Sequence, residues 1–171
     1  MVDFLIIGGG QSAGQKDILK LIIDGKIWFG VKEWWKRMYF TIPEYDDKKR
    51  SDDRNDTILV DGDRKIAVNI ICWWTNLEHN KRRKLELKER YEEGKYEKFD
   101  YVDCINIDDV RDIPIDYYGL MAVPVTYIER WDRDEFDVIG LCNSGSGGLD
   151  KFSPVINGKQ IYCRLLIRRK K

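Results

Sequence analysis

The chain has 171 residues and a mass of 20.3 kDa, which is enough for one domain with a hydrophobic core and too little for two domains of typical size. A hydrophobic fraction of 43% and six tryptophans exclude an intrinsically disordered chain. Thirty basic and thirty acidic residues cancel, so net charge alone predicts neither a nucleic-acid nor a membrane partner.

Cysteine spacing and hydropathy indicate in which cellular compartment the protein is expected. No stretch approaches the ~18 apolar residues of a membrane span, and the N-terminus lacks the basic region and cleavage site of a signal peptide. Three of the four cysteines lie in apolar runs, where a thiol behaves as a small hydrophobe. The four are Cys72, Cys104, Cys142 and Cys163. We therefore expect a cytoplasmic protein with reduced cysteines and, with His79 as its one histidine, no metal site.

The N-terminal part predicts a β-α-β arrangement. Residues 4–7 are apolar and end in three glycines, which is typical of a buried strand of a parallel sheet. Residues 15–24 place apolar side chains at helical spacing, and Gly25 follows as a stop signal. Residues 26–31 are expected to form the second strand.

The middle of the chain predicts antiparallel strands and a helix. Residues 38–42 alternate as a strand, and the charged residues 48–56 are expected to form a loop. Two runs, residues 57–60 and 65–74, flank Asp61-Gly62, a strong hairpin signal. Thr75 and Glu78 have the spacing of a capping box before strong helix formers, which predicts an outer helix up to residue 93.

The C-terminal part predicts further short strands. Residues 101–107 and 136–142 are expected to be strands, with a helical turn over residues 126–131 between them. A second hairpin is predicted over residues 154–167, with its turn at Asn157-Gly158.

Gly8-x-Gly10-x-x-Ala13 matches the dinucleotide fingerprint, in which glycines allow the backbone to approach a pyrophosphate at a helix N-terminus. The acidic residue expected about twenty positions later would be Glu33, beyond the second strand, and the rest of the chain lacks a β-α-β rhythm. A strand-to-helix turn favours glycine in any case. A nucleotide cofactor at this turn therefore stays an alternative.

The segment from Cys72 to Leu77 combines two tryptophans with a polar pair. A tryptophan at a strand end can stack on an extruded base, Asn76 can bond a base edge, and the basic residues 81–83 can hold phosphates. Alternatively, Trp73 and Trp74 face opposite sides of a strand so that at least one is core, and Thr75 is a helix cap.

Two other segments allow a phosphate contact. The amides of the glycine-rich loop at residues 143–148 could approach a phosphate, but the loop could equally be a plain connector. The basic tail of residues 168–171 could bind a phosphate, although such a tail is more often a solvated terminus. Residues 100–137 are strongly acidic and should repel phosphates. No Ser/His/Asp, Cys/His or paired-carboxylate arrangement at telling spacing is visible.

A series of short motifs resembles one enzyme family in order along nearly the whole chain. The motifs are Phe4-Leu-Ile-Ile-Gly8, Ile27-Trp-Phe-Gly30, Cys72-Trp-Trp-Thr-Asn-Leu77, Asp112-Ile-Pro114, Val123-Pro-Val-Thr126, Phe136-Asp-Val-Ile-Gly140, Gly147-Gly-Leu-Asp150 and Asn157-Gly-Lys159 through Arg164-Leu-Leu-Ile-Arg-Arg169. In this order they are similar to the C-terminal half of the EcoRI-type adenine-specific DNA methyltransferases.

The resemblance implies an α/β fold that is part of a Rossmann-like methyltransferase domain, with one β-α-β unit followed by a mixed sheet with antiparallel hairpins. It also implies S-adenosylmethionine as methyl donor and the N6 amino group of adenine in double-stranded DNA as acceptor. In the family, a glycine-rich cofactor loop and an Asn-Pro-Pro-Phe motif precede the strand that corresponds to residues 4–8, and neither is found in this sequence. The Asn-Pro-Pro-Phe motif is excluded because none of the four prolines is adjacent to another. The resemblance therefore yields no catalytic and no cofactor-binding residue.

These inferences predict a single, incomplete methyltransferase-like domain over residues 1–171, with the end of its sheet in residues 1–77 and a DNA-recognition portion in residues 78–171. The expected DNA-binding residues are Trp73, Trp74, Asn76, Lys81, Arg82, Arg83, Arg168 and Arg169. The chain alone should be inactive and should not bind S-adenosylmethionine. The alternative is a non-catalytic DNA-binding or assembly module that pairs with a separate N-terminal half or a second copy.

Overall fold

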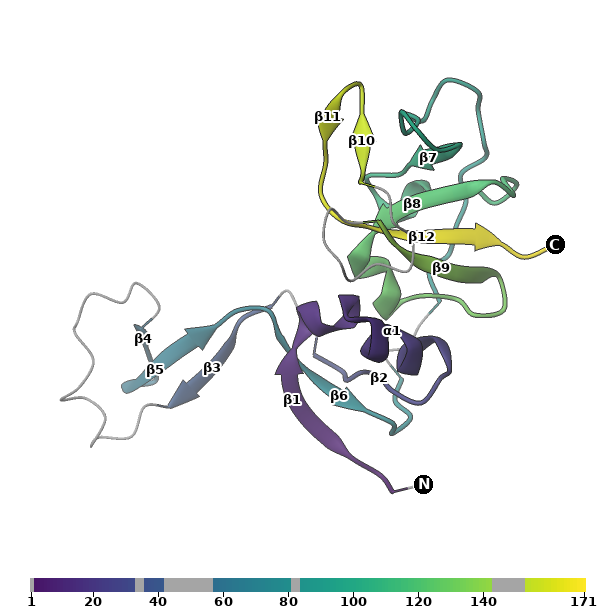
Figure 1. The fold of residues 1–171 in the computed structure, drawn as a ribbon. Helices are drawn as coiled ribbons and strands as arrows, with labels where there is room; N and C mark the ends of the chain where they lie inside the picture. The colour runs from purple at the N-terminus through teal and green to yellow at the C-terminus, as the bar shows by residue number, and fades with distance from the viewer. Residues whose placement is uncertain (1, 33–35, 42–56, 81–83, 143–152) are drawn as a thin grey trace. The chain divides into compact units, whose positions relative to one another are not determined.

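The computed structural model describes residues 2–32, 36–41, 57–80, 84–142 and 153–171 (Figure 1). The chain folds as two compact units. Unit 1 contains Met1–Ser12 and Ile27–His79, and unit 2 contains Ala13–Lys26 and Asn80–Lys171. Neither unit is one continuous stretch, because the helix that follows the first strand clusters with unit 2. The predicted loop at residues 48–56 lies outside the described residues.

A three-stranded sheet in unit 1 contains β1 (Leu5–Gly9), β6 (Ile71–Thr75) and β2 (Trp28–Phe29), in the order β1-β6-β2. Both β1 and β2 run antiparallel to β6. They therefore point in the same direction, as the β-α-β pattern predicts, but β6 separates them. The prediction of a buried parallel β1 is wrong in this respect: among the described residues β1 pairs only with the antiparallel β6.

The second sheet of unit 1 has the order β3-β5-β4, with β3 at Met38–Thr41, β4 at Thr57–Val60 and β5 at Asp63–Val68. Asp61 and Gly62 have φ values of 54° and 84°, the backbone of a primed turn, which confirms the predicted hairpin. The single strand predicted over residues 65–74 is instead divided into β5 and β6 at Ile70, whose φ is 57°.

Unit 2 is built on a four-stranded sheet in the order β7-β8-β12-β9. Its strands are β7 (Cys104–Asn106), β8 (Leu120–Pro124), β9 (Phe136–Cys142) and β12 (Arg164–Arg169). The pair β7/β8 is parallel and the other two pairs are antiparallel. Three consecutive side chains of β8 and three of β12 are fully buried, so both faces of this sheet are covered. The α/β class with a mixed sheet is thus confirmed.

Hydrophobic side chains on one face of that sheet join a cluster with the second hairpin. The cluster contains Phe99, Cys104, Ala122, Cys142, Ile156 and Leu166. The hairpin consists of β10 (Val155–Ile156) and β11 (Lys159–Gln160). Its turn residues Asn157 and Gly158 have φ values of 51° and 73°, as the sequence predicts. All four cysteines are thiols, and burial raises the pKa of Cys104 to about 12.

The helix α1 (Lys16–Ile23) buries Leu19 and Ile22. It ends in a Schellman motif, in which the amides of Gly25 and Lys26 donate to the carbonyls of Ile22 and Leu21. Gly25 has a φ of 69°, which confirms the predicted stop. Short 3₁₀ helices occupy η1 (Gly10–Gly14), η3 (Val110–Asp112) and η4 (Val125–Glu129), the last matching the predicted helical turn.

The helix predicted up to residue 93 is wrong, because the described part of that segment contains no helix. Side-chain burial instead alternates, with Leu85, Leu87 and Tyr91 half-buried between exposed neighbours. The backbone is bonded to another segment, since the carbonyl of Glu89 accepts from the amide of Ile115 at 2.9 Å. Tertiary hydrogen bonds have overridden helix propensity here.

Thr75 is also not a helix cap. It is the buried last residue of β6, where its hydroxyl donates to the carbonyl of Phe4 at 2.7 Å and accepts from the amide of Leu77 at 3.0 Å. The short-range bond is an ST-turn, an alternative that threonine offers to helix initiation.

Candidate nucleic-acid interface

The two tryptophans of β6 differ in their surroundings. Trp74 is buried and packs against the ring of Phe29, with ring centroids 4.4 Å apart. It also covers Gly8, where a Cβ would lie 2.9 Å from the indole. Trp73 is half-buried beside Gly30, whose amide donates to the carbonyl of Trp73. Trp74 is therefore a core residue, as the alternative interpretation requires of at least one of the pair.

Asn76 is held by the start of β1. Its side-chain oxygen accepts from the amide of Phe4 at 3.0 Å, and its side-chain nitrogen donates to the carbonyl of Val2 at 3.1 Å. Asn76 directly follows β6, and because β6 runs antiparallel to β1 and β2, Asn76 lies at the amino ends of these two strands. Ligands of open α/β sheets bind at the carboxyl ends of the strands. The two hydrogen bonds to the start of β1 therefore give the Asn76 side chain a structural role that requires no contact with a DNA base.

The glycine turn after β1 does not fit a cofactor site. The missing side chain of Gly8 is explained by Trp74, and the amide of Gly10 already donates to the carbonyl of Ile70 at 2.8 Å. Ala13 is buried, and a 3₁₀ helix intervenes before α1. An amide bonded within the protein is not available to a pyrophosphate, so the nucleotide alternative loses its structural basis at this turn.

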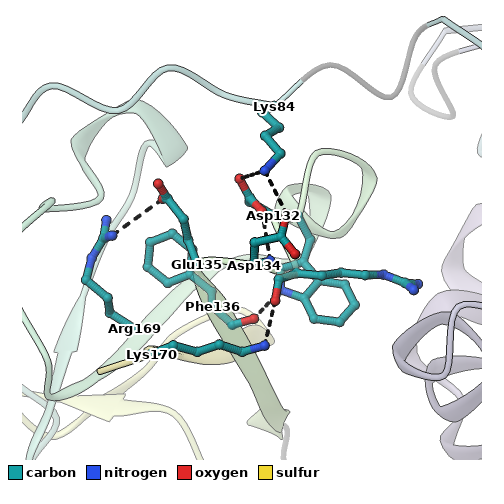
Figure 2. A network of polar contacts seen from close by, with 9 residues as sticks. Lys84, Asp132, Asp134, Glu135, Phe136, Arg169 and Lys170 are labelled. Atoms are coloured by element: carbon teal, nitrogen blue, oxygen red, sulfur yellow. Dashed lines mark hydrogen bonds and ion pairs between the residues drawn. The ribbon is translucent and has the colours of Figure 1, made fainter.

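The basic run that begins at Lys81 lies partly outside the described residues, which start again at Lys84. The ammonium of Lys84 lies 2.8 Å from Asp132 and 3.0 Å from Asp134 (Figure 2). These hydrogen bonds raise the pKa of Lys84 above its ordinary value. Arg82 and Arg83, like Lys81, are not described. The fourth cation of the run is thus already paired with carboxylates.

Asp132 is the buried member of this network. Burial alone would raise its pKa, but the hydrogen bond from Lys84 and the amide of Asp134 bring the pKa below its ordinary value. The acidic character of residues 100–137 is visible in the sequence, but the partner of Asp132 is not. The pairing spans about fifty residues of chain and has no local sequence signal.

The tail cations of β12 also differ from one another. Arg168 is exposed, whereas the guanidinium of Arg169 is largely buried over the ring of Phe136, 4.5 Å from its centroid, and pairs with Glu135. The ammonium of Lys170 donates to the carbonyl of Arg133 at 2.6 Å (Figure 2). Two of these cations therefore stabilise the turn before β9, and only Arg168 of the predicted tail pair is presented to solvent.

The predicted DNA-binding residues consequently fall into three groups. Trp74, Asn76 and Arg169 have structural partners inside the chain. Trp73 and Arg168 are at least partly accessible. The run of residues 81–83 is not described. Among the described residues, no group of three His, Cys, Asp or Glu side chains could hold a metal ion, and no described helix is long and apolar enough to cross a membrane.

Comparison with known proteins gives consistent matches. The model of the family described as adenine-specific methyltransferase EcoRI matches residues 2–170. The type II methyltransferase M.EcoRI of Escherichia coli is 36% identical over 98% of this chain and 50% of its own length. The type II methyltransferase M.MpnI of Mycoplasma pneumoniae is 28% identical over 98% of this chain and 56% of its own length. The chain therefore spans about half the length of these relatives. No solved structure gives a significant match.

Proposed function

Because this chain belongs to the family of the adenine-specific methyltransferase EcoRI, we propose that it is the DNA-facing part of an enzyme that methylates the N6 amino group of adenine in double-stranded DNA. The observation that carries the proposal is the family match over residues 2–170, nearly the whole chain. S-adenosylmethionine supplies the methyl group in such an enzyme.

The chain alone is inactive in this proposal. Its sequence contains no Asn-Pro-Pro-Phe motif, and the turn at Gly8 and Gly10 is filled by Trp74 and bonded to Ile70. The residues present therefore do not fit S-adenosylmethionine at this turn, and no step of methyl transfer is assigned to them.

Incubation of the purified chain with duplex DNA and labelled S-adenosylmethionine tests this directly. We expect no labelled DNA and no saturable cofactor binding by calorimetry. The matched control is the full-length Escherichia coli relative in the same buffer. Clear methyl transfer by the chain alone would show that the catalytic centre lies within these residues.

We assign DNA contact to the accessible members of the predicted set. These are Trp73, Arg168 and the basic run of residues 81–83. We also propose that β1, β6 and β2 form the end of a Rossmann-like sheet, so that residues 1–77 belong to that sheet and residues 78–171 to the recognition portion. The common direction of β1 and β2, with a helix between them in sequence, supports this.

A second candidate function is an assembly module, and the edge of β1 favours it. Leu5, Ile6 and Ile7 are 56%, 56% and 45% exposed, although they form an apolar strand. An apolar strand with an open edge favours pairing with another chain. The partner would be a separate N-terminal half or a second copy.

Light scattering distinguishes these partners. The chain is measured alone and after mixing with a fragment that holds the residues preceding the matched region in the Escherichia coli relative. We expect a mass increase that Ile6→Lys abolishes and that the exposed-residue control Tyr118→Lys retains. A strictly monomeric chain that binds no fragment would rule out the assembly function.

A further inference from the structure

Among the described residues, the β10–β11 hairpin forms a two-stranded sheet of its own. Ile156 is 5% exposed and Ile161 is partly buried, and both pack in the cluster around Phe99. Lys159 and Gln160 are both exposed, but consecutive strand residues point to opposite faces: Lys159 is paired with Ile156 and lies at the rim of its face, while Gln160 lies on the outer face. Figure 1 shows the hairpin as a ribbon beside β7, distinct from the strands of the main sheet.

Tyr162 follows this hairpin and is 87% exposed. A tyrosine usually buries most of its large ring in a core or an interface. The preceding residue, Ile161, packs against the hydrophobic cluster and fixes the backbone at this point. The ring of Tyr162 therefore points away from the cluster into solvent. An exposed aromatic side chain next to two exposed polar side chains indicates a contact surface rather than a packing element.

Asp100 fixes the tip of the hairpin. Its two carboxylate oxygens accept from the amides of Asn157 and Gly158, each at 2.7 Å. The amide of Asp100 also donates to the carbonyl of Val155 at 3.0 Å. A two-stranded hairpin is marginally stable in isolation, so these bonds make it rigid. They also direct the negative charge of Asp100 into the turn.

The exposed residue types match the chemistry of base edges. Glutamine can bond both N6 and N7 of adenine, lysine can bond O6 and N7 of guanine, and an apolar surface can contact the methyl group of thymine. An antiparallel two-stranded ribbon has the width that the major groove admits. We propose that this hairpin reads base sequence in the major groove of duplex DNA, with Gln160 on a base edge from the outer face, Lys159 reaching a base edge from the rim of the hairpin, and Tyr162 as the apolar contact. This inference depends on the proposed function.

A binding selection from duplexes with a randomised ten-base-pair centre tests the proposal. The chain, the double variant Lys159→Ala/Gln160→Ala and the variant Tyr162→Ala are compared at low salt. We expect the double variant to lose about tenfold to a hundredfold of the preference at one or two base positions and to keep the others. Tyr162→Ala should lose preference at a neighbouring position.

Matched controls are Lys88→Ala and Tyr118→Ala, which change exposed residues of the same types elsewhere in unit 2. Thermal melting confirms that each variant is folded. Unchanged base preferences in the double variant would overturn the proposal. So would a uniform loss of affinity with a salt slope lowered by about one, which indicates a phosphate contact.

Failure of the underlying function gives a different result. A wild-type chain that binds no duplex at all would reject the proposed DNA function and this inference with it. A wild-type chain that binds every duplex equally would retain DNA binding and reject base reading by the hairpin.

Discussion

Lys84 shows that the meaning of a charged residue depends on its neighbours in space. In the sequence it completes a run of four cations that favours phosphate binding. In the structure its ammonium is paired with Asp132 and Asp134. A side chain whose charge is balanced by two carboxylates contributes little attraction to a phosphate.

This pairing predicts a pH-dependent stability. The pKa of Asp132 is lowered below its ordinary value of 3.8 in the folded chain. Asp132 therefore adds to the free energy of unfolding above about pH 4, and this added stability is lost as the pH falls through the lowered pKa. In Lys84→Met, burial still raises the pKa of Asp132 and only the backbone hydrogen bonds still lower it, so this pKa should rise and Asp132 should contribute less to the free energy of unfolding at neutral pH. The difference in unfolding free energy between wild type and variant should therefore be largest at neutral pH and shrink below pH 4.

Urea denaturation at several pH values measures that difference. The control is Lys88→Met, because Lys88 pairs with Glu86 at 3.4 Å while both side chains are mostly exposed. Lys88→Met should show little change at any pH. A Lys84→Met variant that follows the wild-type curve at every pH would mean that the pairing with Asp132 does not form in solution.

The end of α1 shows how a local stop signal also serves a tertiary contact. Gly25 closes the Schellman motif with a positive φ. A Cβ at this position would overlap the guanidinium of Arg133. That guanidinium donates to the carbonyl of Ile22 at 2.6 Å, at the negative end of the helix dipole.

Gly25→Ala should therefore destabilise unit 2 for two reasons. The left-handed backbone costs about 1–2 kcal/mol for a residue with a Cβ, and Arg133 must move away from the helix end. In an Arg133→Ala background only the backbone cost should remain. A double-mutant cycle by urea denaturation should thus give a coupling of about 1 kcal/mol. Additive effects of the two substitutions would contradict the packing of Arg133 on Gly25.

The segment after β6 illustrates two periodicities in one sequence. Leu87 and Tyr91 are four residues apart, a spacing that is typical of a helix face, whereas Leu85 and Leu87 are two residues apart, a spacing that is typical of extended chain. The structure follows the period of two, and Tyr91 stacks on Tyr117 with centroids 4.6 Å apart. A period-two pattern in a charged segment was therefore the signal that could have corrected the helix prediction.

Across the whole chain, the cations that are already paired with carboxylates should lower the DNA affinity that the proposed function predicts. Lys84, Arg169 and Lys170 are paired with carboxylates, so we expect phosphate contact mainly from residues 81–83, with Arg168 as the accessible cation of the tail. About three phosphate contacts give a slope of log affinity against log salt near −3. Replacing Lys81, Arg82 and Arg83 together by alanine should flatten this slope.

Fluorescence anisotropy with a labelled duplex at several salt concentrations measures the slope. Lys84→Ala is the matched control, and we expect it to leave the slope nearly unchanged because its charge is already balanced. An unchanged slope in the triple variant would mean that residues 81–83 are only a solvated segment and make no phosphate contact.

Features that depend only on residues adjacent in the chain could be predicted from the sequence. Asp61-Gly62 and Asn157-Gly158 specify primed turns because their backbone adopts positive φ values, and Gly25 specifies a helix end. The ordered motifs also indicated the family that the comparisons support. For the site, burial of at least one of Trp73 and Trp74 followed from strand alternation.

Features that depend on residues far apart in the chain could be seen only in the folded structure. The antiparallel β6 between β1 and β2 follows from pairing across about seventy residues. The pairing of Lys84 with Asp132 decided which cation is balanced, and the bonds of Asn76 to the start of β1 decided its structural role. Such contacts are chosen by competition among hydrogen bonds and packing in the folded chain, for which local propensity carries no information.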